Sequence, residues 1–335
     1  MATYDNIRLE KGLYTTGKSF TEALENLDPS ENYKGTALEG LDAYQRQLKR
    51  FGIKVGGRNS DPIEKFFRTT ESAALFPEYI SRAVNQGFAD NDTVSKIVAT
   101  TTEIDSLDYR SLAVDLSKGN EDMRPILEGT HIPETRVTVK DNLVKLEKIG
   151  RMITASYEAI KYQRLDLFTV TLRQIGRAIA AAQVDRAVNA LTGSDGSEGT
   201  SESIAASGAD FTYDDLLSLW SSFGSFNLTS LIVSTQNLSK ILRMEEFRDS
   251  AAGLTFHATG KLITPFGAEI IHVPGLGDDR IIGFDKGSAV ERVQAGGIVT
   301  EFDKLIDRQL ERASVTVTSG FAKIYNEATK ILTLS

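Results

Sequence analysis

Residues 12–19 contain a sequence with the potential to bind phosphate. Gly12-Leu13-Tyr14-Thr15-Thr16-Gly17-Lys18-Ser19 matches the pattern G-x-x-x-x-G-K-[ST], in which backbone N–H groups and the lysine hold the phosphates of a nucleotide. A loop of this kind needs a buried strand directly before it. Residues 4–11 are too polar and too close to the first residue for such a strand. We therefore interpret the match as a chance one in a chain with 27 glycines, and keep a nucleotide-binding hydrolase that uses Gly12 to Ser19 as an alternative hypothesis.

Other residues with metal-binding or catalytic potential are scattered along the chain. His131, His257 and His272 are the only histidines, and none has the H-x-x-x-H or H-E-x-x-H spacing of a metal site. The chain has no cysteine, which excludes disulfides, thiolate zinc sites, iron–sulfur clusters and cysteine nucleophiles. No G-x-S-x-G nucleophile motif is present.

Acidic pairs and a glycine pair have ordinary structural interpretations. Neighbouring carboxylates on helices and turns are mostly solvated, and Gly275-x-Gly277 lacks the third glycine of a dinucleotide fingerprint, so it predicts a turn between strands. The prediction from residue chemistry is therefore no catalytic residue, no cofactor, no bound metal and no enzyme. The acidic pairs are Asp214-Asp215, Glu245-Glu246 and Asp278-Asp279.

Composition narrows the class of protein. A chain of 335 residues with 41% hydrophobic and 25% charged content is long enough for more than one core, so two domains are expected. The formal charge of -8 does not favour a protein whose main task is to grip a phosphate backbone. The first residues carry no basic and apolar leader, and no segment is long and uncharged enough to span a bilayer. We expect a protein made and used in the cytoplasm, without a membrane partner.

Helical spacing is clearest in the middle of the chain. An apolar stripe predicts one helix over about 157–191, which at 1.5 Å per residue is about 50 Å long. A shorter helix is predicted after Phe76, with Pro77 in its first turn. Within the polar segment 1–66, spacing from Leu38 to Phe51 predicts an amphipathic helix. The long stripe contains Leu165, Phe168, Leu172, Ile175, Ile179 and Ala182.

Strand-like alternation lies on both sides of the long helix. It begins with Val94, Ile97 and Val98 and continues to about 153, where two strands around a polar excursion predict a projecting hairpin. Residues 192–208 are rich in Gly and Ser and predict a mobile loop at a domain boundary. Beyond it, a mixed α/β domain is predicted. Its elements are a helix capped by Thr212-x-x-Asp215, a helix at about 235–247 and strands at 230–233, 270–273, 281–284 and 297–299, followed by a strand-like tail at 313–318 and 321–334.

In this order, the elements resemble those of major capsid proteins of tailed bacteriophages or prophages of the Hong Kong 97 type. Phe66–Ile80 (FFRTTESAALFPEYI) is similar to the segment that joins the N-terminal arm to the peripheral domain in that family. Leu127–Glu134 (LEGTHIPE) is similar to the E-G-x-x-x-P-E string of the extended loop, and Ile153–Ile160 (ITASYEAI) to the entry into the spine helix. The resemblance covers nearly the whole chain, although none of these strings is a chemical motif.

The resemblance implies an α+β fold of the Hong Kong 97 type with an N-terminal arm, an extended β-hairpin loop, a peripheral domain with a long spine helix, and a mixed α/β axial domain. It also implies a structural protein that self-assembles as pentamers and hexamers into the icosahedral head shell of the virion, enclosing double-stranded DNA. The implied ranges are 1–66 for the arm, 67–104, 151–208 and 313–335 for the peripheral domain, 105–150 for the loop and 209–312 for the axial domain.

The resemblance also implies partners and open alternatives. Portal and scaffolding proteins are expected, a decoration protein is possible in such shells, and packaged DNA is expected to be contacted without sequence specificity. We expect an uncleaved subunit assembled in the bacterial host cytoplasm. An encapsulin-type shell that houses enzymes shares the fold and stays as an alternative. Some relatives form Lys–Asn cross-links, but Lys118, Lys140, Lys145, Lys148 and Asn326 align with no cross-linking motif, and we interpret them as ordinary solvated residues.

Overall fold

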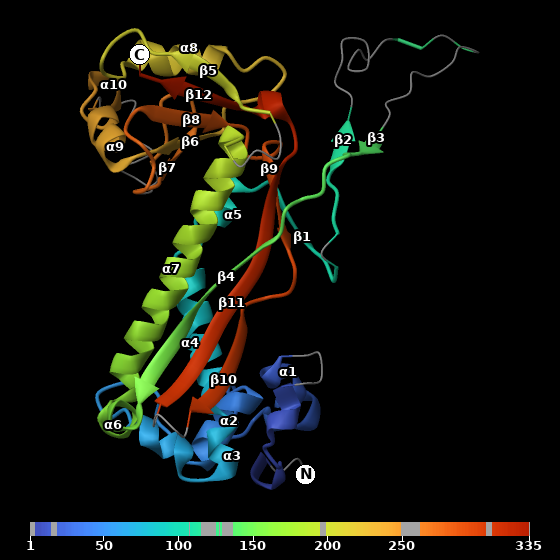
Figure 1. Cartoon of the computed structure of the whole chain (residues 1–335), viewed down its shortest axis with the longest axis vertical. Coiled ribbons are helices and arrows are strands. Elements are labelled where there is room, and N and C mark those ends of the chain that lie inside the picture. The colour runs from blue at the N-terminus through green and yellow to red at the C-terminus, as the bar shows by residue number, and fades with distance from the viewer. Residues whose placement is uncertain are drawn as a thin grey trace. The chain divides into compact units, whose positions relative to one another are not determined.

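The computed structural model describes residues 4–14, 19–106, 108–114, 125–126, 128, 137–194, 199–248, 262–305 and 310–334. The chain forms two compact units, each assembled from separate stretches of sequence (Figure 1). Unit 1 comprises residues 1–91, 149–180 and 297–317, and unit 2 comprises residues 92–148, 181–296 and 318–335.

Helices and strands alternate irregularly along the chain, as expected for an α+β fold. The helices are α1 (Phe20–Leu27), α2 (Ala43–Arg50), α3 (Thr70–Ala73), α4 (Phe76–Ala89), α5 (Val94–Ile97), α6 (Tyr157–Tyr162), α7 (Leu165–Thr192), α8 (Tyr213–Ser221), α9 (Thr235–Ile241) and α10 (Glu245–Arg248). The strands are β1 (Thr100–Glu103), β2 (Leu112–Val114), β3 (Val137–Val139), β4 (Glu147–Ser156), β5 (Glu202–Ala205), β6 (Ser230–Val233), β7 (Glu269–His272), β8 (Arg280–Phe284), β9 (Val290–Gln294), β10 (Val299–Leu305), β11 (Leu310–Lys323) and β12 (Thr329–Thr333).

Unit 1 is built on the contact between α4 and the first half of α7. Gly87 on α4 and Gly176 on α7 let the two helix backbones touch, because a Cβ at Gly176 would overlap the carbonyl oxygen of Val84 and one at Gly87 would overlap that of Arg173. Strands β4, β10 and the first part of β11 add apolar side chains to the same core. A cluster of aromatic rings fills its centre: Phe66, Phe67, Phe76, Tyr79, Phe168 and Phe302.

The N-terminal segment packs into this core instead of standing apart from it. Phe20, Leu24, Tyr44 and Leu48 are buried against α4 and α7. We expected residues 1–66 to contain too little apolar surface for a core of their own, and the structure shows how that surface is used: α1 and α2 each bury one face against unit 1.

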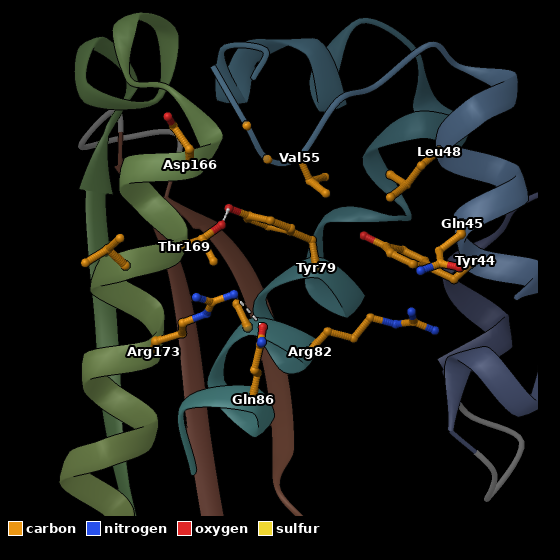
Figure 2. Close-up of a pocket in the computed structure, with 14 residues that line it drawn as sticks. Tyr44, Gln45, Leu48, Val55, Tyr79, Arg82, Gln86, Asp166, Thr169 and Arg173 are labelled. Atoms are coloured by element: carbon orange, nitrogen blue, oxygen red, sulfur yellow. Dashed lines mark hydrogen bonds between the residues drawn. The ribbon is translucent and has the colours of Figure 1, made fainter. Parts of the chain in front are cut away.

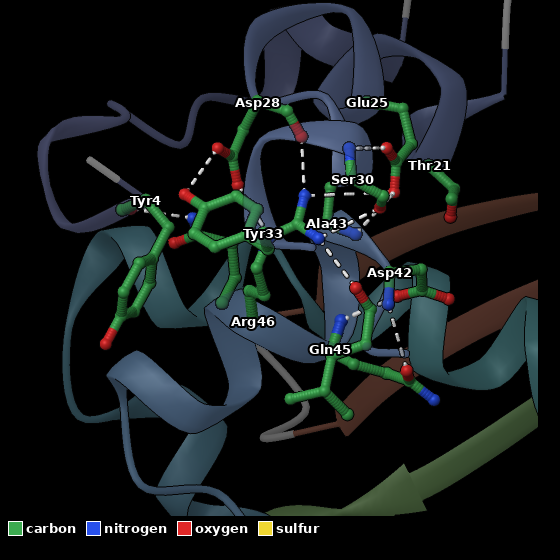
Figure 3. Close-up of polar contacts among 12 residues, drawn as sticks. Tyr4, Thr21, Glu25, Asp28, Ser30, Tyr33, Asp42, Ala43, Gln45 and Arg46 are labelled. Atoms are coloured by element: carbon green, nitrogen blue, oxygen red, sulfur yellow. Dashed lines mark hydrogen bonds and ion pairs between the residues drawn. The ribbon is translucent and has the colours of Figure 1, made fainter. Parts of the chain in front are cut away.

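A buried ion pair joins α1 to α2 within the N-terminal segment (Figure 3). Arg46 is fully buried, and its Nε donates to Asp28 Oδ2 at 2.7 Å. The same guanidinium donates to Ser30 Oγ and Leu41 O and stacks 4.3 Å from the ring centre of Tyr33, whose hydroxyl donates to Asp28 Oδ1. Each charge is thus neutralised and hydrogen-bonded, the condition under which a buried pair is tolerated.

Unit 2 contains a five-stranded sheet in the order β5-β12-β8-β6-β7. All four residues of β6 are buried, because both faces of the sheet are covered. One face packs on α8 and α9, and the other on α5 and the C-terminal part of α7. Strand β1 pairs in parallel with β9, which pairs with residues 319–323 of β11. A separate antiparallel hairpin is formed by β2 and β3.

Several sequence predictions are confirmed in place. The capping box of Thr212 and Asp215 starts α8, and the strands predicted at 230–233 and 281–284 are β6 and β8. The helix predicted after Phe76 is α4. The alternation predicted at 135–139 is confirmed in part as β3, which pairs with β2 (Leu112–Val114), a strand that the alternation did not predict.

Other predictions were wrong. Val94 and Ile97 lie in the short helix α5, not in a strand, because their three-residue spacing buries both on one helical face. The helix predicted at 157–191 is broken at Gln163 and Arg164, since this pair is bonded to residues 61–63: Ile63 N donates to Gln163 O and Pro62 bridges Arg164.

The Gly/Ser-rich segment was also misjudged in part. Residues 202–205 form β5, paired in parallel with β12, and not a loop. Residues 195–198 lie outside the described residues. The helix predicted at 235–247 is two helices, α9 and α10, and the strand predicted at 297–299 begins only at Val299.

Because α4 and α7 touch at Gly176, we expect alanine at this helical position to destabilise the subunit, although alanine usually stabilises a helix relative to glycine. Gly176→Ala should lower the free energy of unfolding by about 1–3 kcal/mol, because the added methyl overlaps the α4 backbone, although alanine normally favours a helix by about 1 kcal/mol over glycine. Urea denaturation of the free subunit measures it. Gln174→Ala, at an exposed position of α7, is the control, and equal stability of both variants would contradict the assignment.

We expect the loss of the buried Arg46 to lower the free energy of unfolding much more than the loss of an exposed arginine. Arg46→Met should destabilise the subunit by about 3–5 kcal/mol because it leaves Asp28 charged and buried. Adding Asp28→Asn should recover part of that loss. Arg8→Met, which removes the exposed pair with Glu10, should change stability by less than about 1 kcal/mol. Chemical denaturation of the four proteins checks this, and similar losses for Arg46→Met and Arg8→Met would sink the prediction.

Candidate functional site

The described residues of the phosphate-loop match at 12–19 lie in two different local structures. Gly12 to Tyr14 belong to a short 3-10 helix (Lys11–Tyr14), and Ser19 is the N-cap of α1, where its hydroxyl accepts from Glu22 N. Residues 15–18, including Lys18, lie outside the described residues. Residues 4–10 form a 3-10 turn and an irregular segment and contain no strand. The described part of this region therefore lacks the strand that a phosphate loop requires.

The histidines and acidic pairs also occupy structural positions. His131 and His257 lie outside the described residues, and His272 is an exposed side chain hydrogen-bonded to Thr235 at 2.8 Å. Burial alone would raise the pKa of Asp215, but hydrogen bonds from Thr212 and Ser207 outweigh it and hold that pKa below its usual value. Asp215 therefore stays ionised and caps α8. Within the described residues, no group of three His, Asp or Glu side chains is placed to hold a metal ion.

The other two acidic pairs, Glu245-Glu246 and Asp278-Asp279, also occupy structural positions. Glu245 and Glu246 are exposed in the first turn of α10. Asp278 accepts from Ser234, and Asp279 pairs with Arg280 in the turn between β7 and β8, which also contains Gly275 and Gly277. In the part of the chain that the structure describes, no helix is both long enough and apolar enough to cross a membrane.

A groove of about 420 Å³ opens in unit 1 between α2, α4 and α7 (Figure 2). Tyr79 donates to Leu165 O and contacts Thr169, and burial raises its pKa to about 12. Arg173 Nη2 donates to Gln86 Oε1 at 2.6 Å. Arg82 is held by Asp42 and Glu78 and lies 4.3 Å from the ring centre of Tyr44.

The groove can hold a ligand but is poorly suited to catalysis. Burial also raises the pKa of Tyr44 well above its usual value, so both tyrosines are protonated at neutral pH. The lining arginines are committed to Gln86 and to carboxylates. Its lining residues therefore offer hydrogen bonds and apolar contacts, but no nucleophile paired with a base. Sequence analysis missed this groove, since its walls come from residues 44–57, 79–86 and 166–173.

The hairpin of unit 2 exposes an apolar face. Leu112 lies opposite Val139, and Val137 is two residues from Val139 on the same face. All three are more than half exposed, at 56% and 57%. A two-stranded ribbon with an uncovered apolar face is marginal alone and gains stability by packing against another surface. The sequence signal was the alternation of Val137, Thr138 and Val139.

The base of this hairpin is anchored in unit 2. Lys140 N donates to Ser111 O, and Val144 N donates to Tyr109 O, both at 2.8 Å. Val144 is buried with Val293 and Ala322. The ribbon is therefore attached to a packed structure while its apolar face stays uncovered.

Further large apolar side chains are exposed in unit 1, on α6 and the start of α7. They are Tyr162, Leu167 and Val170, which are 74%, 56% and 61% exposed. These residues belong to the helix predicted at 157–191. Periodicity identified the apolar stripe that is buried, but it did not identify these exposed apolar positions.

The lysines considered for cross-linking have ordinary contacts where they are described. Lys140 Nζ donates to Lys323 O at 2.6 Å, and Lys145 pairs with Glu147, which also accepts from Arg186. Lys148 lies on β4. Asn326 is exposed in a 3-10 turn before β12, and Lys118 lies outside the described residues.

Solved structures with the same fold are shells. The capsid of a native GTA particle matches with a TM-score of 0.54 and 13% identity over 73% of this chain and 90% of that one. A virus-like particle from Pyrococcus furiosus matches with a TM-score of 0.51 and 13% identity over 76% and 98%. Gordonia phage Cozz gives a TM-score of 0.51 and 16% identity over 73% and 87%. These likenesses confirm the predicted capsid fold of the Hong Kong 97 type.

A family model decides the assignment. No curated protein matches this sequence. The model described as phage capsid protein matches residues 140–320, more than half of the chain, and this range includes β4, all of α7 and four of the five strands of the sheet β5-β12-β8-β6-β7. The fold of the matching structures agrees with that match, and the chain belongs to the phage capsid protein family.

Proposed function

We propose that this capsid protein is the major subunit of a tailed-phage head, assembling through pentamers and hexamers into an icosahedral shell around double-stranded DNA. The observation that carries the proposal is the uncovered apolar face of Leu112, Val137 and Val139 on a hairpin anchored in unit 2. Such a face is a liability in an isolated subunit and becomes buried when many identical copies associate.

The domain roles follow the same proposal. Residues 105–150 act as the extended loop that lies over a neighbouring subunit, and residues 209–312 act as the axial domain around the five-fold and six-fold axes. Residues 67–104, 151–208 and 313–335 form the peripheral domain. Residues 1–66, the proposed arm, pack on the rest of unit 1 through buried apolar side chains, and the Arg46–Asp28 pair joins α1 to α2. Only residues of the arm outside these contacts are therefore proposed to contact a neighbouring capsomer.

The shell role implies partners and a location. Portal and scaffolding proteins direct assembly in the host cytoplasm, and the mature subunit resides in the virion. A decoration protein is a further candidate partner on the outer surface. DNA is contacted without sequence specificity, in keeping with a net charge of -8, which does not favour tight binding along the whole inner wall. The subunit works by geometry and not by catalysis.

A shell that encloses protein cargo is the second candidate. The match to the virus-like particle from Pyrococcus furiosus, which covers 98% of that chain, keeps this encapsulin-type alternative open, because it shows the same fold in a particle that is described only as virus-like. Particle contents separate the two: packaged double-stranded DNA supports the phage head, and a protein cargo supports the compartment.

Removing the apolar face should prevent assembly without unfolding the subunit. Val137→Thr with Val139→Thr keeps side-chain shape and strand propensity but adds hydroxyls, so the yield of closed particles should fall about tenfold or more. Electron microscopy and sedimentation measure particles, and thermal unfolding shows that the free subunit is intact. Thr138→Val, on the other face of the ribbon, is the matched control. Normal particles from the double variant would exclude this contact.

The phosphate-loop hypothesis has its own test. Magnesium and ATP should leave the melting temperature unchanged, because the described residues before Gly12 provide no strand for the loop. A ligand at 100 times its Kd would stabilise the protein by about 2.7 kcal/mol. A rise in melting temperature that disappears in Lys18→Ala would establish nucleotide binding and reopen the hydrolase alternative.

A further inference from the structure

The groove of unit 1 is lined by one face of each of three helices, α2, α4 and α7. Its volume of about 420 Å³ lies within the range of ligand-binding sites in proteins, about 300–1,000 Å³. The lining residues of each helix are spaced by three and four positions and therefore share one helical face, as do Tyr79, Ala83 and Gln86 on α4. Ridges of side chains at this spacing are the surface on which a further helix packs.

Much of the lining is apolar. Leu48 and Ala83 are buried, and Val55 is partly buried. Val170 also lines the groove but is 61% exposed, and Leu167, three residues before it on α7, is 56% exposed. Two neighbouring aliphatic side chains thus continue the apolar lining onto the exposed side of α7, and a bound partner would remove them from water.

Positive charge lies around this apolar lining. Arg173 lines the groove, is exposed and donates to the neutral Gln86, so no carboxylate offsets its charge (Figure 2). Arg177, one turn further along α7, is also exposed. Two more exposed cations directly follow lining residues in the sequence, Lys49 and Arg58. None of these four cations forms an ion pair with another described residue.

Acidic groups on the same helices and their caps are fewer or already paired. Asp42 and Glu78 both pair with Arg82. Asp166 lines the groove, and Asp90 is exposed at the end of α4. Two carboxylates therefore stand against four cations without an ion pair, in a chain whose net charge is -8. This local excess of positive charge favours an acidic partner.

We propose that the groove of unit 1 binds an amphipathic helix of a partner protein, apolar on one face and rich in Asp and Glu beside that face. Apolar side chains of the partner helix pack on Leu48, Val55 and Val170, and one of its carboxylates accepts from Arg173. The groove is large enough for side chains but not for a whole helix, so the partner helix lies over α4 and α7 and inserts its side chains between them and α2. This binding does not depend on the proposed shell function.

The apolar lining favours a protein over a nucleic acid. Phosphate groups would neutralise Arg173 and Arg177, but they would also place charge against aliphatic side chains that offer them no hydrogen bond. An acidic amphipathic helix satisfies both features, because its apolar face covers the aliphatic lining while its carboxylates reach the cations.

Binding of synthetic peptides to the full-length subunit tests the proposal. The probe is a fluorescent peptide of about 15 residues, near the shortest length for a stable isolated helix, with leucines on one helical face and glutamates beside them. Fluorescence anisotropy should show saturable binding. Control peptides with lysine in place of glutamate, or serine in place of leucine, should bind about tenfold more weakly or worse. Absence of binding by the acidic peptide, or equal binding by either control, would overturn the proposal.

Variants of the subunit locate the contact. Val170→Glu should weaken binding of the acidic peptide about tenfold or more, because a repelling charge replaces an apolar contact. Gln174→Glu adds the same charge at an exposed position of α7 outside the lining and is the matched control. Arg173→Gln should weaken binding about fivefold, whereas Arg151→Gln, at an exposed position of β4, should not. Thermal unfolding shows that each variant is folded, and equal effects of the two glutamate variants would reject this groove as the site.

Two further measurements separate the other occupants. Duplex DNA that binds more tightly than the peptide, and loses this binding in Arg173→Gln, would overturn the proposal in favour of a nucleic acid. Self-association of the subunit that the peptide reverses in sedimentation would overturn it in favour of a second copy. Neither experiment measures particle formation, so failure of the shell function and failure of this proposal are distinguishable.

Discussion

Backbone contact between α4 and α7 at Gly87 and Gly176 is the constraint on which unit 1 depends. The two helices approach so closely that neither position accepts a Cβ, and the aromatic core of Phe76, Tyr79 and Phe168 is formed beside this crossing. The groove of unit 1 uses the same two helices as walls. A methyl group at either glycine would therefore separate the helices, loosen the core and reshape the groove together.

The N-terminal segment adds to this frame by a different interaction. Apolar burial holds α1 and α2 on unit 1, while the Arg46–Asp28 pair fixes the two helices relative to each other. Arg82 extends the network, because it bonds to Asp42 at the start of α2, to Glu78 on α4 and to Thr21 on α1. A segment with few apolar residues is thereby held by paired charges, of which Arg46 and Asp28 are fully buried and Arg82 and Asp42 are partly exposed.

The surfaces that we propose to be functional are those that the packed cores leave uncovered. Large apolar side chains stay exposed on the ribbon face of Leu112, Val137 and Val139 and on helices α6 and α7. In a protein that works by repeated self-association, such surfaces are the counterpart of an active site: their shape and charge select the neighbour, and many weak contacts add up across a closed lattice.

Sequence alone determined the class of the protein and much of its local structure. The inventory without cysteine or clustered histidine, the periodicity of α4 and α7, the strands β6 and β8, the Thr212–Asp215 cap and the order of elements all depend on residue type and near-neighbour spacing, and they were predictable for that reason. The shell fold was expected from a resemblance to capsid proteins, in the order of those elements and in short strings such as Leu127–Glu134.

Only the tertiary structure decided where contacts with residues distant in the sequence override the local preference for helix, strand or loop. Gln163 and Arg164 leave the helix because residues 61–63 bond to them, and residues 202–205 become a strand because β12 lies beside them. Likewise, the types of Val94 and Ile97 favour a strand, but both side chains are buried in the core of unit 2 from one face of helix α5. The same holds for the surface: Leu112, Val139 and Trp220 are large apolar residues of the kind that cores bury, and only the packing of the rest of the chain shows that they are exposed, since burial is a property of the folded whole and not of a sequence window.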